Sequence, residues 1–203
     1  MSAERVRPGD RLVVFGAGGH ARSVGDAITR IGAAVLAMVE DDDEGIALAA
    51  HATGAVIAIG DAGTRLAVMQ RLTASGVTVL SVVATTATLA TDAALGVGSV
   101  VLEHAHVGPG SRLGDACIVN TRASVDHDCV LGDGVHVAPG AVLAGGVTCG
   151  PRALIGTGAS IIPGVDIGAQ AIVGAGAAVT ADVPCGCVAV GVPARSRRRR
   201  SES

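Results

Sequence analysis

The pattern of apolar and polar positions changes its period near residue 83. Before that point, short apolar runs of strand length alternate with segments whose apolar residues recur at helical spacing. The predicted strands are 12–15, 35–39, 56–59 and 78–82, and the predicted helices are 21–31 and 64–75. In the second helix Leu66, Met69 and Leu72 share one face. Alternation of strand and helix predicts a small parallel sheet with helices on its faces, an α/β domain that we assign to residues 1–82.

From Val83 onward an aliphatic residue recurs at every sixth position. Of the seventeen positions from Val83 to Val179, sixteen are Val, Leu or Ile, and the other is Cys149. Four positions after each of them stands a small residue, always Ala, Ser, Cys or Val. This spacing is typical of the hexapeptide parallel β-helix, in which three short strands complete a coil of about 18 residues. We therefore predict a β-helix over residues 83–195 and a basic tail over residues 196–203. The usual rule for connections between parallel strands would make the coils of this β-helix right-handed.

The composition agrees with a narrow coil interior. The chain has 203 residues, 30 of them Gly, and 49% are hydrophobic, yet Phe15 is its single aromatic residue and it has no Lys. Large rings normally supply much of a core's buried area, so an aromatic-filled core is excluded. With 16% charged residues and a net charge of −3, the chain is also not a disordered one.

Charge is unevenly distributed along the chain. Residues 1–194 carry a net charge of −7, whereas residues 195–203 carry +4. An acidic body without aromatic side chains lacks both the basic stripe and the stacking platforms of a nucleic-acid surface, so we expect no nucleic-acid partner. We interpret the run from Arg197 to Arg200 as a solvated tail; contact with the phosphates of a bound ligand is the alternative.

No secretory segment or membrane span is visible in the sequence, because the longest apolar stretch, 77–90, is short and interrupted by Thr and Ser. The five Cys are odd in number and form no CxxC pair, so we expect reduced thiols, a cytoplasmic protein and no membrane insertion. Cys117, Cys129 and Cys149 fall on inward or corner positions of the repeat and are expected to be core residues. Cys185 and Cys187 are assigned no role.

One histidine stands out by its neighbours. In Val125-Asp126-His127-Asp128 an imidazole lies between two carboxylates at an outward position of the repeat. A neighbouring carboxylate raises the basicity of an imidazole and can fix its tautomer, as a general base requires. An ordinary exposed surface histidine is the alternative interpretation.

A zinc site is a further alternative for these histidines. His104 and His106 form an HxH pair, and with His127 or His136 they could supply imidazole ligands of the kind that hexapeptide-helix carbonic anhydrases share across a subunit interface. Nothing in the spacing selects three of them, so we expect no metal.

The sequence Gly16-Ala-Gly-Gly-His20-Ala follows a strand and opens a helix, matching GxGxxA, and Glu40 and Asp41 follow about 20 residues later. By spacing alone this is a dinucleotide-binding fingerprint, in which backbone N–H groups at a helix N-terminus hold phosphates. Tight packing of the strand against the helix is the structural alternative.

Four segments together resemble sugar O/N-acetyltransferases of the sialic acid O-acetyltransferase and UDP-amino-sugar (bacillosamine-type) N-acetyltransferase kind, within the hexapeptide-repeat acyltransferase superfamily. They are GAGGHARSV near the start, VIAIGDAGTR at 56–65, VNTRASVDHDCVLGDGVHVAPGAVLAGGV at 119–147 and VAVGVPAR at 188–195. The resemblance implies a Rossmann-like N-terminal domain on a left-handed β-helix, assembled as a homotrimer, with acetyl-CoA between adjacent helices.

The resemblance also implies roles for individual residues. His127 matches the general base and Asp128 the acid that supports it, while Asp126 matches an acceptor contact. The CoA positions it implies are His136, Thr157 and Ala175. The nucleotide-sugar positions it implies are Gly18, Gly19, His20, Glu40, Asp41 and Gly60, and these replace the dinucleotide interpretation. Three departures are the Glu40-Asp41 pair, where Asp-Asp is common, the absence of a His-Pro-Ser start to the repeat, and the arginine tail.

We therefore predict an acetyl-CoA-dependent N-acetyltransferase that acts on the amino group of a nucleotide-linked amino sugar by direct transfer. O-acetylation of a sialic acid or another sugar hydroxyl is the first alternative, because the same base could catalyse it. A non-catalytic trimer that binds nucleotide sugars is the second.

Overall fold

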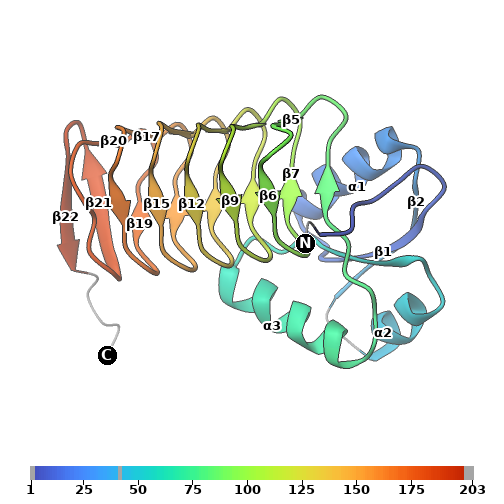
Figure 1. Ribbon diagram of the computed structural model, residues 1–203. Coiled ribbons are helices and arrows are strands. Elements are labelled where there is room, and N and C mark those ends of the chain that lie inside the picture. The colour runs from blue at the N-terminus through green and yellow to red at the C-terminus, as the bar shows by residue number, and fades with distance from the viewer. Residues whose placement is uncertain (1–2, 41–42, 199–203) are drawn as a thin grey trace.

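The structure, a computed structural model, describes residues 3–40 and 43–198. An N-terminal α/β domain leads into a stack of short strands wound as a parallel β-helix (Figure 1). The fold class predicted from the two periods is confirmed. Among the described residues, no helix is both long enough and apolar enough to cross a membrane.

The N-terminal domain is a three-stranded parallel sheet between helices. Its elements are β1 (Arg11–Phe15), α1 (Gly19–Ile31), β2 (Ala34–Val39), α2 (Asp43–Ala50), β3 (Gly54–Ile57) and α3 (Ala62–Ala74), with the strand order β2-β1-β3. One face of the sheet packs on α1 through Leu12 and Val14. The other face packs on α2 and α3 through Val13 and Phe15, so the single aromatic ring belongs to this core.

Several predicted boundaries in this domain are wrong. No strand spans 78–82: Val79 forms only an isolated bridge with Ala55, and the chain then enters the coil. The third strand begins at Gly54 and ends at Ile57, two residues before the predicted end at 59, and α2 was not predicted at all.

The two predicted helices begin earlier than expected because glycine or a capping side chain precedes them. α1 begins at Gly19 rather than at residue 21, since its N-cap is Gly18. α3 begins at Ala62 rather than at residue 64, since Asp61 caps it by accepting from the Thr64 N–H at 2.8 Å. The face of α3 that is fully buried carries Arg65, Val68 and Leu72, and of the predicted face only Leu72 is fully buried.

Seventeen two-residue strands build the coil. They are β4 (Val82–Val83), β5 (Thr88–Leu89), β6 (Ala94–Leu95), β7 (Val100–Val101), β8 (His106–Val107), β9 (Arg112–Leu113), β10 (Ile118–Val119), β11 (Ser124–Val125), β12 (Val130–Leu131), β13 (His136–Val137), β14 (Val142–Leu143), β15 (Thr148–Cys149), β16 (Leu154–Ile155), β17 (Ser160–Ile161), β18 (Asp166–Ile167), β19 (Ile172–Val173) and β20 (Ala178–Val179). The second residue of each strand is the position predicted from the period of six.

These strands form three sheets, the faces of a prism, and each strand pairs with those 18 residues away. We name each sheet by its first strand: the β4 sheet, the β5 sheet and the β6 sheet. The predicted aliphatic residues and the small residues that follow them fill the interior together, including Cys117, Cys129 and Cys149. The cysteines therefore act as small core residues, as predicted, whereas Cys185 is exposed.

The N-terminal domain sits on the outer side of the β4 sheet. Val24, Ala27 and Ile28 of α1 share a core with the outward side chains of the first coils, Val82 and Val100. At the far end, β21 (Cys187–Gly191) continues the β4 sheet and β22 (Ala194–Arg198) folds back antiparallel to it (Figure 1). Two arginines of the basic run thus lie in a strand, and the other two lie outside the described residues.

Candidate active site

His127 and Asp128 form a hydrogen-bonded dyad in the turn between β11 and β12, and Asp128 has a left-handed backbone with φ 58°. The distance between His127 Nδ1 and Asp128 Oδ2 is 2.9 Å. Asp126 Oδ1 accepts from the His127 N–H at 2.8 Å, which fixes the start of the turn. The predicted juxtaposition of these three residues is present in the structure.

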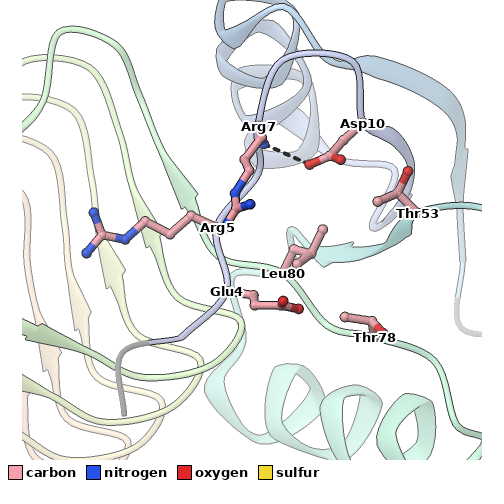
Figure 2. A pocket seen from close by; sticks show the side chains of 7 residues that line it. All are labelled: Glu4, Arg5, Arg7, Asp10, Thr53, Thr78 and Leu80. Atoms are coloured by element: carbon pink, nitrogen blue, oxygen red, sulfur yellow. Dashed lines mark hydrogen bonds between the residues drawn. The ribbon is translucent and has the colours of Figure 1, made fainter.

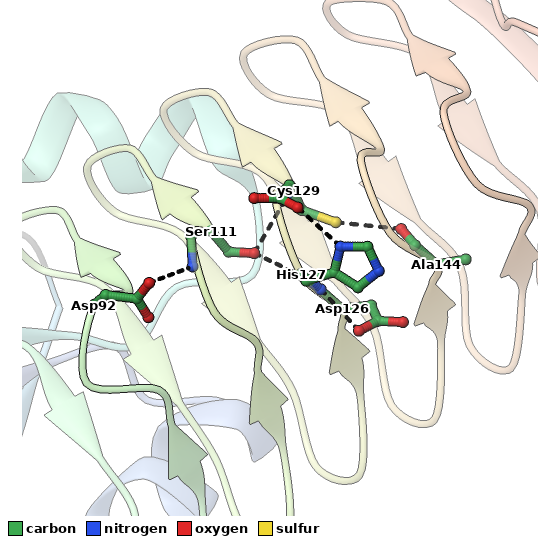
Figure 3. A network of polar contacts seen from close by, with 8 residues as sticks. Asp92, Ser111, Asp126, His127, Cys129 and Ala144 are labelled. Carbon is green, nitrogen blue, oxygen red and sulfur yellow. Dashed lines mark hydrogen bonds and ion pairs between the residues drawn. The ribbon is translucent and has the colours of Figure 1, made fainter.

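A buried serine one coil earlier makes hydrogen bonds to the backbone at both ends of this turn. Ser111 Oγ donates to the Asp126 carbonyl at 2.6 Å and accepts from the Cys129 N–H at 3.0 Å (Figure 3). Ser111 occupies a small-residue position of the repeat where most coils have Ala, and its hydroxyl joins two successive coils. The turn that carries His127 therefore has both its ends tied to the coil.

The dyad leaves one nitrogen of His127 available to a substrate. An ionised carboxylate only accepts, so Nδ1 carries the proton and Nε2 has a free lone pair. The His127 side chain is 59% exposed. The hydrogen bond to Asp128 raises the pKa of His127 above its usual value, and the charge of Asp126 raises it further. The ring is thus an accessible base of increased strength.

Gly145, in the next coil, lies against the imidazole ring. A Cβ at this position would overlap His127 Cε1 and Nε2. The absence of a side chain at Gly145 therefore lets the ring lie over the coil surface.

A second group of predicted residues gathers at the carboxyl edge of the three-stranded sheet. Gly18 and Gly19 begin α1 after β1, Glu40 follows β2, and Gly60 follows β3. The chain after β1 passes close to the chain after β3 at Gly16, where a Cβ would lie 2.5 Å from the Ala58 carbonyl oxygen. The φ of Gly16 is 132°, which also favours glycine at this position. α1 has no side-chain cap and no acidic residue in its first turn, so no side chain of that turn competes for its N-terminal N–H groups. Asp41 lies outside the described residues.

This edge meets the β4 sheet at His136. Gly60 and Asp61 line a cavity of about 500 Å³ together with His136, Arg152 and further side chains of the coil. His20, in the first turn of α1, lies beside it, with 6.3 Å between the His20 and His136 ring centroids. The structure thus brings the glycine loop, the Gly60 loop and His136 together.

The hydrogen bonds of Asn120 indicate the tautomer of His136. Asn120 Oδ1 accepts from the Thr121 N–H at 2.8 Å, so its amide nitrogen is the atom that faces His136 Nε2 at 3.2 Å. Nε2 must then accept, which leaves the proton on Nδ1. Burial, assisted by the charge of Arg65, lowers the pKa of His136 and of His20 to about 4. Both rings are neutral near pH 7.

Thr157 and Ala175 follow β16 and β19, so both lie on the edge between the β4 sheet and the β5 sheet, one coil apart. Both are exposed, and the Gly176 N–H donates to the Thr157 carbonyl at 2.9 Å. They form a continuous column on the coil surface.

Besides the Thr157 and Ala175 column, the predicted residues of one chain form two separate groups. His127 lies on the edge between the β5 sheet and the β6 sheet, and in a three-sided prism this edge is opposite the third face, the β4 sheet. The glycine loop, the Gly60 loop and His136 all lie at the β4 sheet. His127 and the predicted sugar-binding loops are therefore on opposite sides of the same coil.

Two further residues at this junction had been assigned no role from the sequence. Arg65 is fully buried between α3 and the coil, and Asn120 orients His136. The sequence does contain a feature that points to Arg65. Its spacing from Val68 and Leu72 places it on the buried face of α3, where an arginine is unexpected.

Other features of the described residues do not join these groups. A smaller cavity lies near the other edge of the three-stranded sheet, and Arg7, Asp10 and Leu80 are among the residues that line it (Figure 2). The Arg7 N–H donates to Asp10 at 2.7 Å. Within residues 3–40 and 43–198, no group of three or more His, Cys, Asp or Glu side chains is arranged to hold a metal ion.

Comparison with protein families gives two matches that together span both parts of the chain. Residues 11–72 match the family described as PglD N-terminal domain. Residues 110–145 match the bacterial transferase hexapeptide family of six repeats. A search of curated protein sequences finds no match.

Solved structures match over almost the whole chain. PerB from Caulobacter crescentus, in complex with CoA and GDP-perosamine, is 36% identical, with 92% of this chain and 96% of that chain covered and a TM-score of 0.88. A mutant of perosamine N-acetyltransferase from the same organism is 34% identical over 93% of this chain and 97% of that chain, with a TM-score of 0.89. The acetyltransferase domain of PglB from Neisseria gonorrhoeae, in complex with acetyl coenzyme A, is 33% identical over 93% of this chain and 100% of that chain, with a TM-score of 0.85.

Proposed function

This chain belongs to the family of hexapeptide-repeat sugar N-acetyltransferases with a PglD-type N-terminal domain, and we propose that it transfers the acetyl group of acetyl-CoA to the amino group of a nucleotide-linked amino sugar. The observation that carries the chemistry is the dyad of His127 and Asp128, with its accessible Nε2. Transfer to nitrogen is preferred to transfer to a hydroxyl because similar structures include a perosamine N-acetyltransferase.

In the proposed step His127 takes up the proton that the acceptor amine loses. The amine nitrogen attacks the thioester carbonyl, a C–N bond forms, and a proton passes from nitrogen to His127 Nε2. The C–S bond then breaks, and the imidazolium returns the proton to the departing CoA sulfur. The Asp128 carboxylate stabilises the imidazolium through Nδ1–H, and Asp126 is proposed to contact the acceptor.

We propose direct transfer without an acyl-enzyme. Cys129 is the nearest thiol in sequence to His127, but it is buried with its Sγ 3.3 Å from the Ala144 carbonyl oxygen (Figure 3). Burial raises the pKa of the Cys129 thiol, which disfavours the thiolate. Such a thiol is poorly suited to act as a nucleophile.

The nucleotide sugar is assigned to the carboxyl edge of the N-terminal sheet. Gly18, Gly19 and His20 begin α1, where N–H groups that no side chain caps suit a diphosphate. Glu40 and Gly60 follow β2 and β3 at the same edge, and Asp41, next to Glu40 in the chain, is assigned with them. With one aromatic ring in the chain, and that ring buried, recognition rests on backbone N–H groups, carboxylates, His and Arg.

Acetyl-CoA is assigned to the surface of the coil. His136, in its neutral Nδ1–H form, can donate a hydrogen bond near the thioester, while Thr157 and Ala175 supply the exposed column for the rest of CoA. Similar structures contain acetyl coenzyme A or CoA.

A homotrimer reconciles these assignments with the geometry of one chain. Because His127 and the sugar-binding loops lie on opposite sides of a coil, a single chain cannot bring them to one substrate. A closed ring of three copies can place the His127 edge of one subunit against the β4 sheet of the next. We propose that each active site is formed in this way.

The test is an acceptor screen with acetyl-CoA, in which release of free CoA thiol is followed for GDP-perosamine, UDP-linked amino sugars and free sialic acid. Acetylation of a nucleotide-linked amine supports the proposal, and acetylation only of a sialic acid or other sugar hydroxyl overturns it.

The role of His127 is tested by His127→Ala, which should lower turnover by about 10²–10⁴ because a positioned base is lost. His51→Ala, an exposed histidine at the end of α2, is the matched control and should leave turnover unchanged. Near-normal turnover by a correctly assembled His127→Ala protein contradicts the mechanism.

A further inference from the structure

Arg65 joins the two parts of the molecule through backbone carbonyls alone. Its side chain is fully buried. Nε donates to the Ala116 carbonyl and Nη2 to the Gly134 carbonyl, each at 2.7 Å, and both acceptors belong to the coil. Nη1 donates to the carbonyls of Ile59 and Gly60 in the N-terminal domain, at 2.7 and 2.8 Å. One guanidinium thus fastens a loop of the domain to two successive coils.

This cation has no carboxylate partner among the residues that the structure describes. Asp61, four residues earlier, turns its Oδ1 to the N–H and hydroxyl of Thr64, both at 2.8 Å. Burial lowers the pKa of Arg65 to about 10, so the side chain stays protonated near pH 7. A buried charge is costly even when its hydrogen bonds are made, so stability alone gives no reason for an arginine at this place.

Arg65 binds one residue that lines the cavity and another that lies close in the chain to its opposite wall. Gly60 lies on the domain side of the cavity, and its carbonyl is bound by Nη1. Gly134 lies two residues before His136, which lines the coil side, and its carbonyl is bound by Nη2. The position of the Gly60 loop relative to His136 is therefore set by one side chain.

The charge of Arg65 also acts on the two histidines at this junction. His20 of α1 and His136 of β13 are both half-buried, and Arg65 of α3 is the charged group that lowers the pKa of each in addition to burial. His20 also lowers the pKa of His136. A positive neighbour disfavours the imidazolium, so both rings remain neutral.

We propose that Arg65 is a positioning residue for nucleotide binding, which holds the Gly60 loop against the coil beside His136 so that one cavity fits the nucleoside diphosphate. The inference rests on the proposed function, and it adds a residue that does not itself contact the substrate.

The test compares binding of nucleoside diphosphate with binding of CoA in Arg65→Lys. Lysine keeps the charge but cannot reproduce the fork of four bonds to two parts of the chain. We expect the Kd for GDP or UDP, whichever the wild type binds, to rise by about 10-fold to 100-fold because the loop shifts. The Kd for free CoA should stay within about twofold, since CoA lacks the acetyl thioester assigned to His136 and its other contacts, Thr157 and Ala175, lie on another edge of the coil. Arg30→Lys, on the exposed end of α1, is the matched control.

Binding measured by calorimetry below the unfolding temperature separates positioning from a merely structural role. An unchanged nucleotide Kd in folded Arg65→Lys overturns the proposal, as does an equal loss of nucleotide and CoA binding. Failure of the wild type to acetylate any amine would instead contradict the proposed function and leave this binding comparison valid.

Two NMR readouts complete the test. In Arg65→Gln the ring signals of His20 and His136 should titrate at higher pH than in the wild type, and Arg65→Lys should restore the wild-type values; unchanged titration in Arg65→Gln overturns the electrostatic part. If neither variant folds, the Nε–H signal of Arg65 in the wild type is followed during addition of GDP or UDP. A shift of that signal on nucleotide binding supports the proposal, and no shift during saturable binding overturns it.

Discussion

His127 and His136 are nine residues apart in the chain, yet their pKa values shift in opposite directions. His127 is exposed and hydrogen-bonded to a carboxylate, which stabilises its charged form. His136 is half-buried beside the positive Arg65, and both conditions disfavour its charged form. The same residue type therefore provides a base at one place and a neutral hydrogen-bond donor at the other.

Asp128→Asn tests the pairing of His127 with its carboxylate. An amide oxygen can accept the same hydrogen bond from Nδ1–H, but it carries no charge to stabilise the imidazolium. We expect the pKa of His127 to fall, so the base stays unprotonated to lower pH, while kcat decreases because the base is weaker. The pKa is measured by NMR titration of the His127 ring, and kcat at saturating concentrations of both substrates.

Asp166→Asn, an exposed carboxylate on the β6 sheet, serves as the control for this change. It should leave both the His127 titration and kcat unaltered. A His127 pKa that rises or stays constant in Asp128→Asn would show that the carboxylate does not set the basicity of the ring.

Contacts between side chains were predictable where the interacting groups are adjacent in the chain. Asp126, His127 and Asp128 are consecutive, so their pattern indicated that they lie together, and the role of His127 as a base stays a proposal. Arg65 bonds to carbonyls 51 and 69 positions away, and any residue type can supply a carbonyl, so no pattern of side chains marks its partners. Asn120 is likewise 16 positions from His136.

At the scale of the elements, the coil was predictable and the N-terminal domain less so. Every coil strand places an inward aliphatic residue, or Cys149, at the same position of the repeat, and seventeen repetitions make that signal strong. In the α/β domain each element occurs once, and its ends depend on local caps such as Asp61. Helix α2 was missed because it has only eight residues and buries only Gly45 and Ala49, so no helical spacing of large apolar residues marks it.

Leu143→Ala tests the inward ladder of the coil. Leu143, the second residue of β14, is fully buried in a core that runs along the whole prism. We expect a loss of about 2–5 kcal/mol in the free energy of unfolding, because a cavity remains between fixed coils. Leu143→Ile keeps the volume and should lose less than about 1.5 kcal/mol.

Denaturant unfolding is compared for both variants at equal protein concentration, because association of subunits shifts apparent stability. Equal losses for Leu143→Ala and Leu143→Ile would show that shape, rather than filled volume, decides stability at this position.

At the scale of the whole molecule, the central feature is the separation of His127 from the loops at the β4 sheet. In the proposed trimer the two halves come from different subunits. In this arrangement a single subunit has no complete active site, and activity requires the trimer.

Mixing two inactive variants tests the shared site. His127→Ala removes the base and His20→Ala weakens the sugar-binding loop, so each trimer of one type should be inactive or nearly so. In mixed trimers one site of three pairs an intact base with an intact loop, so isolated mixed trimers should have about one third of wild-type activity. The variants are co-expressed with different tags, and mixed trimers are isolated before assay.

Recovery of activity only after subunit mixing supports the shared site. If each subunit instead held a complete site, mixing would restore nothing, because every subunit carries one defect.

The side chains of the coil repeat every six residues, but its faces repeat every 18. An insertion of 18 residues would lengthen the prism by one rung, about 4.8 Å, and leave every later residue on its own face. An insertion of six residues before Thr157 would keep the hydrophobic interior intact. It would nevertheless move every later strand to the neighbouring face, so Thr157 and Ala175 would no longer lie on the edge that follows the β4 sheet. The coil can therefore lengthen by 18 residues, but by no smaller number, without displacing its surface residues from their faces.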